Sequence, residues 1–374
     1  MKKTALPSVL GGISPAEFMR KYWHKKPLLI RQAVPGMQPL LSRQALFAMA
    51  GQEGVESRLI RADSQTKQWT FDHGPFKPRE LPPIKQAHWT LLLQGMDLHH
   101  DAVAALRDRF RFVPDARLDD LMISYATDGG GVGPHFDSYD VFLLQAHGQR
   151  RWRISPQTDL RLRDDLPLKI LKAFKPTETW VLDAGDMLYL PPHYAHEGVA
   201  VGECMTYSIG FKAESPQSLA HELLPRLVDM GPEEVQARYA DPRQTATEHA
   251  AQIPAALQAF AHQAVLQALQ HRGDLNCVLG EFLSEPKSQV WFEAQSVPRQ
   301  LGAVRLDRKS KMLYDDEFVF INGESWRCQG ADAKWLRLLA DQRSLAANQV
   351  LKASTRLQTL LKDWLAAGWL QAVK

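Results

Sequence analysis

Two short segments carrying histidine and aspartate place the strongest constraint on this sequence. His135 and Asp137 follow a glycine-rich stretch at residues 129–134, and His196 ends the run at residues 191–196. Residues two apart in a β-strand point to the same side, so His135 and Asp137 can face one point from one stretch of backbone. His196, on another strand, can supply a third ligand. Two imidazoles and one carboxylate form the ligand set of non-haem Fe(II) oxygenases, which leaves one face of the metal open for cosubstrate and molecular oxygen.

Other histidines compete for these roles. The chain has a second His-x-Asp pattern at His99 and Asp101, but its apolar flanks are typical of a helix boundary, with neither a glycine turn nor a strand. We predict that this copy is structural. His193 competes with His196, but in the second cupin motif glycine usually occupies the place of His193, so we prefer His196. The alternative for the predicted site is a surface turn at residues 135–137 and a hydrogen-bonded histidine at 196.

Composition narrows the class of protein. A length of 374 residues suggests two or three domains, and 45% hydrophobic with 23% charged residues is ordinary for a soluble protein. The net charge of +3 is too small to indicate a nucleic-acid partner. The three cysteines, Cys204, Cys277 and Cys328, lie far apart, so neither a disulfide framework nor a zinc ribbon is indicated. No apolar run approaches the ~18 residues of a membrane span, and we expect a cytoplasmic protein.

The first part of the chain predicts helices followed by a β-rich core. Ser14, Pro15 and Glu17 are typical of a helix start, with an N-cap, a first-turn proline and a capping-box glutamate. A strand is expected at residues 26–31. From Leu121 many short strands are separated by turn signals, which suggests a closed antiparallel barrel. The expected strands are residues 121–126, 139–145, 150–154, 180–182, 187–190 and 205–211, with a turn at residues 148–149 between the second and the third.

The last part of the chain predicts two further segments. Helices are expected at residues 218–228, 233–239 and 253–271, and their apolar content suits either a dimer interface or packing within the chain. A hairpin around the Asn322–Gly323 turn, with helices at residues 333–340 and 355–368, resembles a winged helix. A small excess of Lys and Arg in this last segment is weak evidence for nucleic-acid binding, and we favour a solvated surface.

Several of these motifs together resemble the bacterial JmjC-type ribosomal oxygenases, within which the branch that hydroxylates an arginine of the sixteenth large-subunit ribosomal protein is nearest. The resemblance follows the order and length of essentially the whole chain, and it is most specific in the barrel. It is carried by residues 22–28 (YWHKKPL), 120–124 (DLMIS), 130–137 (GGVGPHFD), 139–142 (YDVF), 150–153 (RRWR), 191–192 (PP) and 196–198 (HEG).

The resemblance implies an α+β protein with a double-stranded β-helix (cupin/JmjC) barrel. The catalytic domain would span residues 1–213, a helical dimerisation segment residues 214–284, and a small winged-helix-like domain residues 285–374. The protein would be a homodimer and a 2-oxoglutarate-dependent dioxygenase that acts on a ribosomal protein. In that family, the residues matching His135, Asp137 and His196 hold Fe(II).

Other positions match the cosubstrate site of the family. Arg150 would hold the distal carboxylate of 2-oxoglutarate, since a planar guanidinium can grip a carboxylate through two parallel hydrogen bonds. Ser124 matches a position that hydrogen-bonds the same carboxylate, and Thr206 stands where close relatives usually carry asparagine. A cationic arginine substrate needs acidic or aromatic partners near the metal. The candidates that flank the motif are Asp128, Tyr139 and Asp140.

Three other functions use the same residues. One is a JmjC oxygenase that acts on a histidine or a methyl-lysine of another protein. Another is a non-oxidative metal cupin, such as a sugar isomerase, against which Arg150 argues. The third is a metal-sensing regulator that combines a barrel with a DNA-binding winged helix. Oxygen consumption with Fe(II) and 2-oxoglutarate separates an oxygenase from the second, and binding of duplex DNA would support the third.

Overall fold

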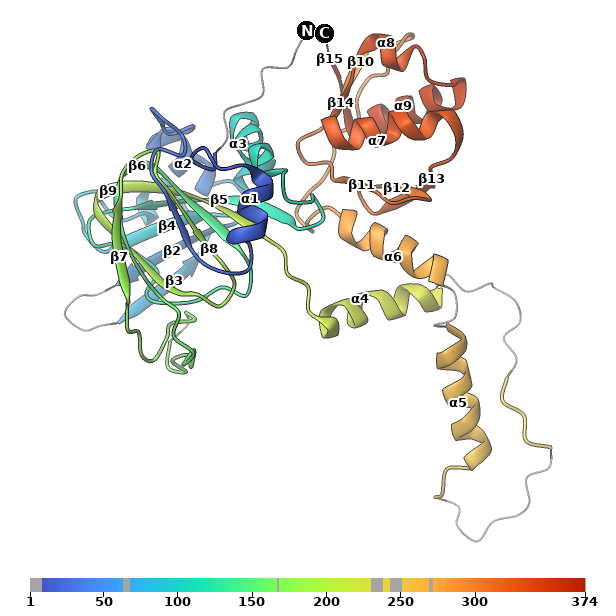
Figure 1. Ribbon diagram of the computed structural model, residues 1–374, viewed down its shortest axis with the longest axis horizontal. Helices are drawn as coiled ribbons and strands as arrows, with labels where there is room; N and C mark the ends of the chain where they lie inside the picture. The colour runs from blue at the N-terminus through green and yellow to red at the C-terminus, as the bar shows by residue number, and fades with distance from the viewer. Residues whose placement is uncertain are drawn as a thin grey trace. The chain divides into compact units, whose positions relative to one another are not determined.

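The computed structural model describes residues 9–62, 68–166, 168–229, 238–242, 251–268 and 272–373. The chain forms two compact units, Met1–Ala213 and Glu214–Lys374, which are described separately (Figure 1). Among the described helices, none combines the length and the apolar character needed to cross a membrane.

The first unit is built on one curled sheet in which all described pairings are antiparallel. Its strands are β1 (Leu28–Ile30), β2 (Ser57–Ala62), β3 (Trp69–His73), β4 (Trp89–Leu93), β5 (Leu118–Ala126), β6 (Val141–Ser155), β7 (Glu178–Leu182), β8 (Met187–Leu190) and β9 (Ala195–Phe211). The order is β1-β8-β6-β9-β5-β4-β2-β3, and β7 pairs with β6. The long strands β6 and β9 therefore lie at the centre, and the predicted strands of the barrel are confirmed.

Helices cover part of this sheet, as Figure 1 shows. They are α1 (Pro15–Lys21), α2 (Arg43–Ala50) and α3 (Asp101–Arg107), with short 3-10 turns at Pro78–Glu80, Met96–Leu98 and Asp108–Phe110. The predicted start of α1 is confirmed, because the side chain of Ser14 accepts a hydrogen bond from the Glu17 N–H at 3.1 Å. Phe18 of α1 packs against Phe142 and Tyr189, with ring centroids 5.3 and 4.9 Å away. These aromatic contacts join the helix to the sheet.

The turn predicted at Gly148 and Gln149 is wrong. Strand β6 continues through both residues to Ser155, and its pairing with β9 shifts register between Gln145 and His147 and again between His147 and Gln149. The reason is that β9 is long enough to pair with both halves of β6, so the glycine falls in an irregularity of one strand. The bend and stronger twist that such an irregularity gives help the sheet to curl.

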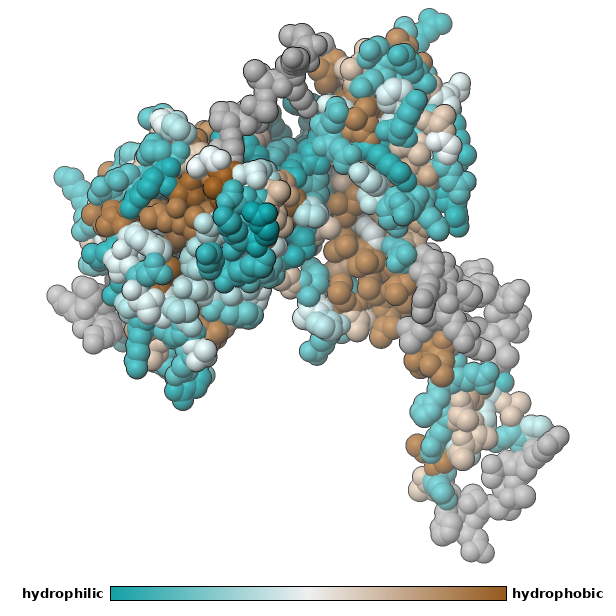
Figure 2. Space-filling view, in the orientation of Figure 1, coloured by the Kyte–Doolittle hydropathy of each residue, from teal (hydrophilic) through white to brown (hydrophobic). Residues whose placement is uncertain are grey.

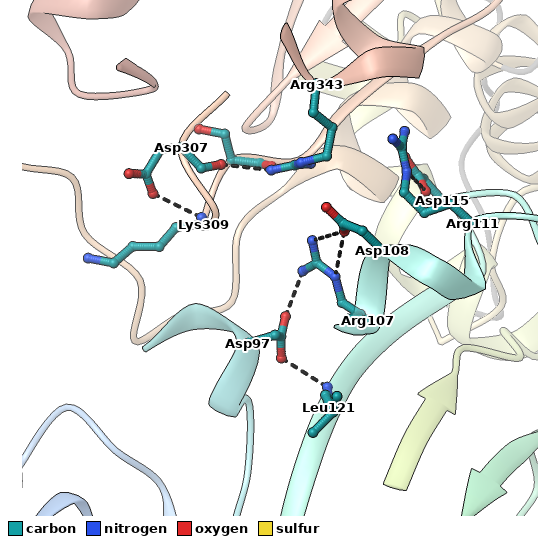
Figure 3. A network of polar contacts seen from close by, with 10 residues as sticks. Asp97, Arg107, Asp108, Arg111, Asp115, Leu121, Asp307, Lys309 and Arg343 are labelled. Atoms are coloured by element: carbon teal, nitrogen blue, oxygen red, sulfur yellow. Dashed lines mark hydrogen bonds and ion pairs between the residues drawn. The ribbon is translucent and has the colours of Figure 1, made fainter. Parts of the chain in front are cut away.

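A buried ion pair joins α3 to the turn before it. Arg107 donates to Asp97 at 2.6 Å and to Asp108 at 2.8 Å, as Figure 3 shows. The other oxygen of Asp97 accepts from the backbone N–H of Leu121 in β5, at 2.9 Å. The side chain of Asp97 is only 1% exposed, so almost no water can replace these partners. The pair fixes the start of β5 relative to the helices.

In the described part of the second unit, helices come first and a small domain of strands and helices follows. The helices are α4 (Pro216–Asp229), α5 (Ala255–Ala268) and α6 (Arg272–Ser284). Strands β10 (Ala303–Leu306), β14 (Ser344–Leu345) and β15 (Leu370–Val373) form one sheet, and β11 (Met312–Tyr314), β12 (Phe318–Ile321) and β13 (Glu324–Arg327) form another. Helices α7 (Ala333–Gln342), α8 (Ala347–Val350) and α9 (Thr355–Ala366) complete it, with a 3-10 turn at Gly330–Asp332.

Most of the predicted elements of this unit are found. The hairpin β12–β13 turns at Asn322 and Gly323, whose φ angles are 52° and 89°, as an Asn-Gly hairpin turn requires. Most of the helix predicted at residues 233–239 lies outside the described residues. Between α4 and α6, Leu223, Leu227 and Val278 form a small apolar core. The separate boundary predicted at residue 285 stays a prediction.

Apolar side chains also remain exposed on the helices of the second unit. Leu224 and Val228 of α4 are 45% and 59% exposed, and Val265 of α5 is 61% exposed. Figure 2 shows apolar atoms gathered over α4 and α6. Such a patch on a helical surface is typical of an interaction site.

Replacing Arg107 by alanine should lower the free energy of unfolding by about 3–5 kcal/mol, because it leaves the Asp97 carboxylate buried without its ionic partner. Chemical denaturation followed by circular dichroism measures this change. Arg161 provides a matched control, because its side chain is 77% exposed and pairs with Asp159 at the surface. Arg161→Ala should change stability by less than about 1 kcal/mol. Equal effects of the two substitutions would contradict the structural role of the buried pair.

Candidate metal centre

The metal-binding motifs meet through backbone pairing. His135 lies just before β6, and His196 is the second residue of β9. The N–H of His135 donates to the carbonyl of His196 at 2.9 Å, and the reverse bond measures 2.8 Å. The two imidazole rings consequently lie side by side, with centroids 4.2 Å apart.

The glycine-rich stretch allows this segment to lie close to β9. Gly129 donates to the carbonyl of Ala200, and Ala200 donates to the carbonyl of Gly130. At Gly131, a β-carbon would stand 2.6 Å from the carbonyl oxygen of Gly198, closer than real contacts allow. A side chain at residue 131 would therefore push the segment away from the strand that carries His196.

Asp137 completes the group. One ligand atom from each of His135, Asp137 and His196 can be chosen so that all lie within 4.8 Å of one another. The nearest approach between His196 Nε2 and Asp137 Oδ2 is 3.7 Å. The His196 side chain is 3% exposed and that of Asp137 is 22% exposed, so the imidazole is buried while the carboxylate stays partly accessible to water. Among the described residues, this is the one group of three metal-ligating side chains.

Both imidazoles are oriented by backbone carbonyls. Nδ1 of His135 lies 2.9 Å from the carbonyl oxygen of Gly133, and Nδ1 of His196 lies 2.9 Å from that of Tyr194. A carbonyl can only accept, so each Nδ1 carries the proton in this arrangement. The lone pair is then on Nε2, which is the ring position available for a metal.

His193 does not join the group. Its φ angle is 61°, which fits a turn position where glycine is common. Its backbone N–H donates to the carbonyl of Asp137 at 2.7 Å, and its ring faces that of Phe136, with centroids 5.8 Å apart. The second His-x-Asp pattern, at His99 and Asp101, lies at the beginning of α3, which starts at Asp101. Its prediction as a helix boundary is therefore confirmed.

Arg150 lies inside the barrel on β6. Residues 150, 152 and 154 are buried, whereas Arg151 is exposed and Arg153 pairs with Glu197 on the outer side, as strand alternation predicts. Arg150 is 4% exposed, and its Nε and Nη2 atoms make no hydrogen bond among the described residues. Its guanidinium lies 5.8 Å from the Trp152 ring, which in turn lies 5.9 Å from the His196 ring.

Ser124 and Thr206 lie opposite one another in β5 and β9. The Ser124 hydroxyl donates to the carbonyl of Thr206 at 3.3 Å, and the Thr206 hydroxyl donates to Oε1 of Gln145 at 2.9 Å. Sequence reasoning missed Gln145, which is fully buried on β6. A glutamine that ends an otherwise apolar strand was the signal available, because a buried amide needs polar neighbours.

The three candidate substrate contacts differ in their surroundings. Tyr139 is 38% exposed, and Asp128 is exposed, with Oδ1 accepting from the Gly202 N–H at 2.8 Å. Asp140 is fully buried and accepts from the Tyr189 hydroxyl at 2.5 Å, with His24 Nε2 at 2.9 Å. Burial raises the pKa of Asp140. These contacts tie β8 to the N-terminal segment, so we leave Asp140 out of the proposed substrate site.

Burial, reinforced by the neighbouring His135, lowers the pKa of His196 to about 4, and the carboxylate of Asp137 only partly opposes this shift. The imidazole of His196 is therefore neutral at neutral pH, which is the form that binds a metal.

In the metal-free protein, this low pKa should make stability depend on pH. Between the ordinary value of 6.5 and about 4, the unfolded chain binds a proton at residue 196 that the folded site does not bind. The free energy of unfolding should fall through this window as the pH falls, by up to about 3 kcal/mol. Urea titrations in the presence of a chelator measure it. His196→Gln should show a smaller dependence, and an unchanged slope in that variant would refute the assignment.

Comparisons with known proteins agree with this geometry. Residues 105–219 match the JmjC domain family, and residues 267–371 match the ROXA-like winged helix. The chain is 32% identical over 291 residues to the Escherichia coli protein named ribosomal protein uL16 3-hydroxylase, covering 76% of this chain and 75% of that protein. It is 27% identical to a probable ribosomal oxygenase of Haemophilus influenzae, covering 96% of both chains.

The fold also matches a solved structure. The E. coli ribosomal oxygenase YcfD, in complex with cobalt and 2-oxoglutarate, superposes with a TM-score of 0.81 at 26% identity. The match covers 96% of this chain and 98% of YcfD. The predicted order of a β-helix barrel, helices and a winged-helix-like domain is thereby confirmed.

Proposed function

The chain belongs to the JmjC-type ribosomal oxygenases, and on that premise we propose that it is an Fe(II)- and 2-oxoglutarate-dependent hydroxylase of an arginine side chain on a large-subunit ribosomal protein. The observation that supports this most is the combination of two imidazoles and a carboxylate with a buried guanidinium whose Nε and Nη2 lack partners. The first group suits a divalent metal with open coordination positions. The second suits an anionic cosubstrate.

The surroundings of Arg150 support 2-oxoglutarate as that anion. A buried cation without a counter-ion is costly, so a site that keeps one is built to receive a negative charge. A guanidinium binds a carboxylate through two parallel hydrogen bonds, and the Ser124 hydroxyl lies on the neighbouring wall of the barrel. A dicarboxylate whose other end reaches the metal satisfies both groups. The solved structure of YcfD contains 2-oxoglutarate together with a metal, cobalt, which supports the proposal that one site takes both a metal and this dicarboxylate.

When bound, Fe(II) with 2-oxoglutarate and molecular oxygen supplies the oxidising chemistry that places a hydroxyl on an unactivated carbon. The chain contributes position and exclusion of water. Nδ1–H bonds to the carbonyls of Gly133 and Tyr194 hold His135 and His196 with Nε2 toward the metal. Arg150 sets the direction of the cosubstrate. The buried side chains of Trp152 and Ile154, on the same face of β6 as Arg150, keep bulk water away from the cosubstrate side of the site.

An arginine substrate is supported by the exposed groups near the motif and by the family. The E. coli relative is named as a hydroxylase of a ribosomal protein. A guanidinium is recognised by carboxylates and aromatic faces, and Asp128 and Tyr139 offer one of each at the surface. A ribosomal protein substrate is consistent with the cytoplasmic location that we propose.

The direct test of this function is an assay with a defined substrate. The protein is incubated with Fe(II), 2-oxoglutarate, oxygen and a peptide that spans the target arginine, and the added oxygen is located by fragmentation. A matched peptide with lysine in place of the arginine is the control. Hydroxylation of the arginine alone is expected. Oxygen on a histidine would overturn the arginine assignment and keep the oxygenase, while absence of both succinate and oxygen uptake would overturn the oxygenase itself.

Arg150→Ala should weaken the apparent affinity for 2-oxoglutarate by roughly two to four decades, because removal of one partner of a buried charge pair costs about 3–5 kcal/mol. Binding of the metal alone should change little. Arg151→Ala is the control, since that side chain lies on the exposed face of the same strand. Arg150→Lys keeps the charge without the two-pronged geometry and should recover only part of the loss. Near-normal affinity for 2-oxoglutarate in Arg150→Ala would sink the assignment.

We also propose that the helices of residues 214–284 pair two chains. The exposed apolar side chains of α4 and α5 support this, because a lone helix face of that kind is costly in water. Light scattering at micromolar concentration should report twice the chain mass. The double substitution Leu224→Asp and Val228→Asp should convert the dimer to a monomer without unfolding the first unit. A wild-type monomer would contradict the proposal.

A further inference from the structure

Gly133, two residues before His135, is enclosed by side chains from two distant segments. A β-carbon on Gly133 would stand 2.9 Å from Cδ1 and 3.1 Å from Cγ1 of Ile170, and 3.3 Å from Cζ2 of Trp69. The φ angle of Gly133 is +78°, which other residues rarely adopt. Ile170 and Trp69 therefore fill the space that a side chain at residue 133 would occupy, and they pack against this glycine.

This peptide is bonded to a candidate metal ligand. The carbonyl of Gly133 accepts the hydrogen bond from Nδ1 of His135 at 2.9 Å. That bond sets the tautomer and the plane of the imidazole, and groups that orient a ligating histidine in this way tune its affinity for the metal. A movement of Gly133 would consequently turn the ring of His135.

The two flanking side chains come from different parts of the first unit. Trp69 begins β3, the edge strand of the sheet. Ile170 lies in the connection between β6 and β7 and is 4% exposed. Its neighbour Leu171 is 3% exposed and donates its N–H to the carbonyl of Pro134 at 2.8 Å. The connection thus lies directly against the residues that lead into the metal motif.

Residues 161–163 of the same connection pair with residues 170–172 through backbone hydrogen bonds. Arg163 donates its backbone N–H to the carbonyl of Ile170 at 2.8 Å, and Lys172 donates to that of Arg161 at 2.9 Å. Leu162 and Leu171 form a bridge between the two segments. Ile170 is therefore presented to Gly133 by a small hydrogen-bonded loop. Ile170 and Trp69 thus both pack against the glycine whose carbonyl is bonded to His135.

We propose that Trp69 and Ile170 are positioning residues for the metal centre: they hold the Gly133 peptide so that its carbonyl keeps His135 oriented for the metal. This rests on the proposed role of His135 as a metal ligand. Neither side chain touches the metal or the substrate in this account, and their effect passes through the Gly133 carbonyl.

The test measures binding of Mn(II) alone, as a redox-stable probe, by electron paramagnetic resonance of the free ion. Ile170→Ala and Trp69→Leu should each weaken Mn(II) binding by roughly tenfold, the lower end of the range for groups that orient a metal ligand. Ile170→Leu restores apolar carbon near Gly133 and should recover most of the affinity. Leu162→Ala is the control, because it removes an apolar side chain from the same connection, whereas the atoms nearest Gly133 belong to Ile170 and Trp69.

The thermal midpoint of each variant separates positioning from loss of fold. The proposal expects Ile170→Ala to remain folded at the assay temperature but to bind Mn(II) more weakly, and Leu162→Ala, whose side chain is half-buried, to lower the midpoint less and to bind Mn(II) like the wild type. Wild-type affinity in both Ile170→Ala and Trp69→Leu would overturn it, and so would an equal loss in Leu162→Ala. If the wild-type protein binds no Mn(II), the proposed metal site fails instead, and the two failures are thereby distinguished.

Discussion

The pair of backbone hydrogen bonds between His135 and His196 is the constraint on which the site depends. Residues that exchange both bonds lie directly opposite one another, so their side chains share one face at close range. A shift of one residue in this pairing would turn one imidazole away from the other. Because β9 also pairs with β5 and β6, the centre of the sheet determines the position of His196. The backbone pairing with His196 then positions His135.

The interior of the barrel shows a second consequence of this design. Arg150 occupies a position where an apolar residue would pack at lower cost, and it keeps a buried charge with two donor atoms that no described residue satisfies. The Arg150 guanidinium has already lost its water when the protein folds. Binding of an anion offsets this desolvation cost, and this favours binding of the proposed anionic cosubstrate. The Thr206 hydroxyl and the Gln145 side-chain oxygen satisfy one another, whereas the two Arg150 donors remain for the proposed anionic ligand.

The sequence predicted those features that depend on local chemistry. The His-x-Asp spacing, the Ser14 cap and the Asn322–Gly323 turn each involve neighbours along the chain, and the structure contains all three groupings. Long-range pairing decided the rest. The predicted turn at Gly148 is absent because β9 extends past it, and Asp140 is buried because Tyr189 and His24 reach it from other segments. No pattern near these residues shows such contacts.

The central claim is that this chain hydroxylates an arginine of a large-subunit ribosomal protein, and intact-mass spectrometry of ribosomal proteins from cells with and without the gene tests it most directly. The account predicts that one large-subunit protein is heavier by the mass of a single oxygen atom in wild-type cells, and that fragmentation places this oxygen on an arginine. Restoring the gene should restore the added mass, whereas a gene encoding His196→Ala should not. Identical masses for every ribosomal protein in the two strains would contradict the account.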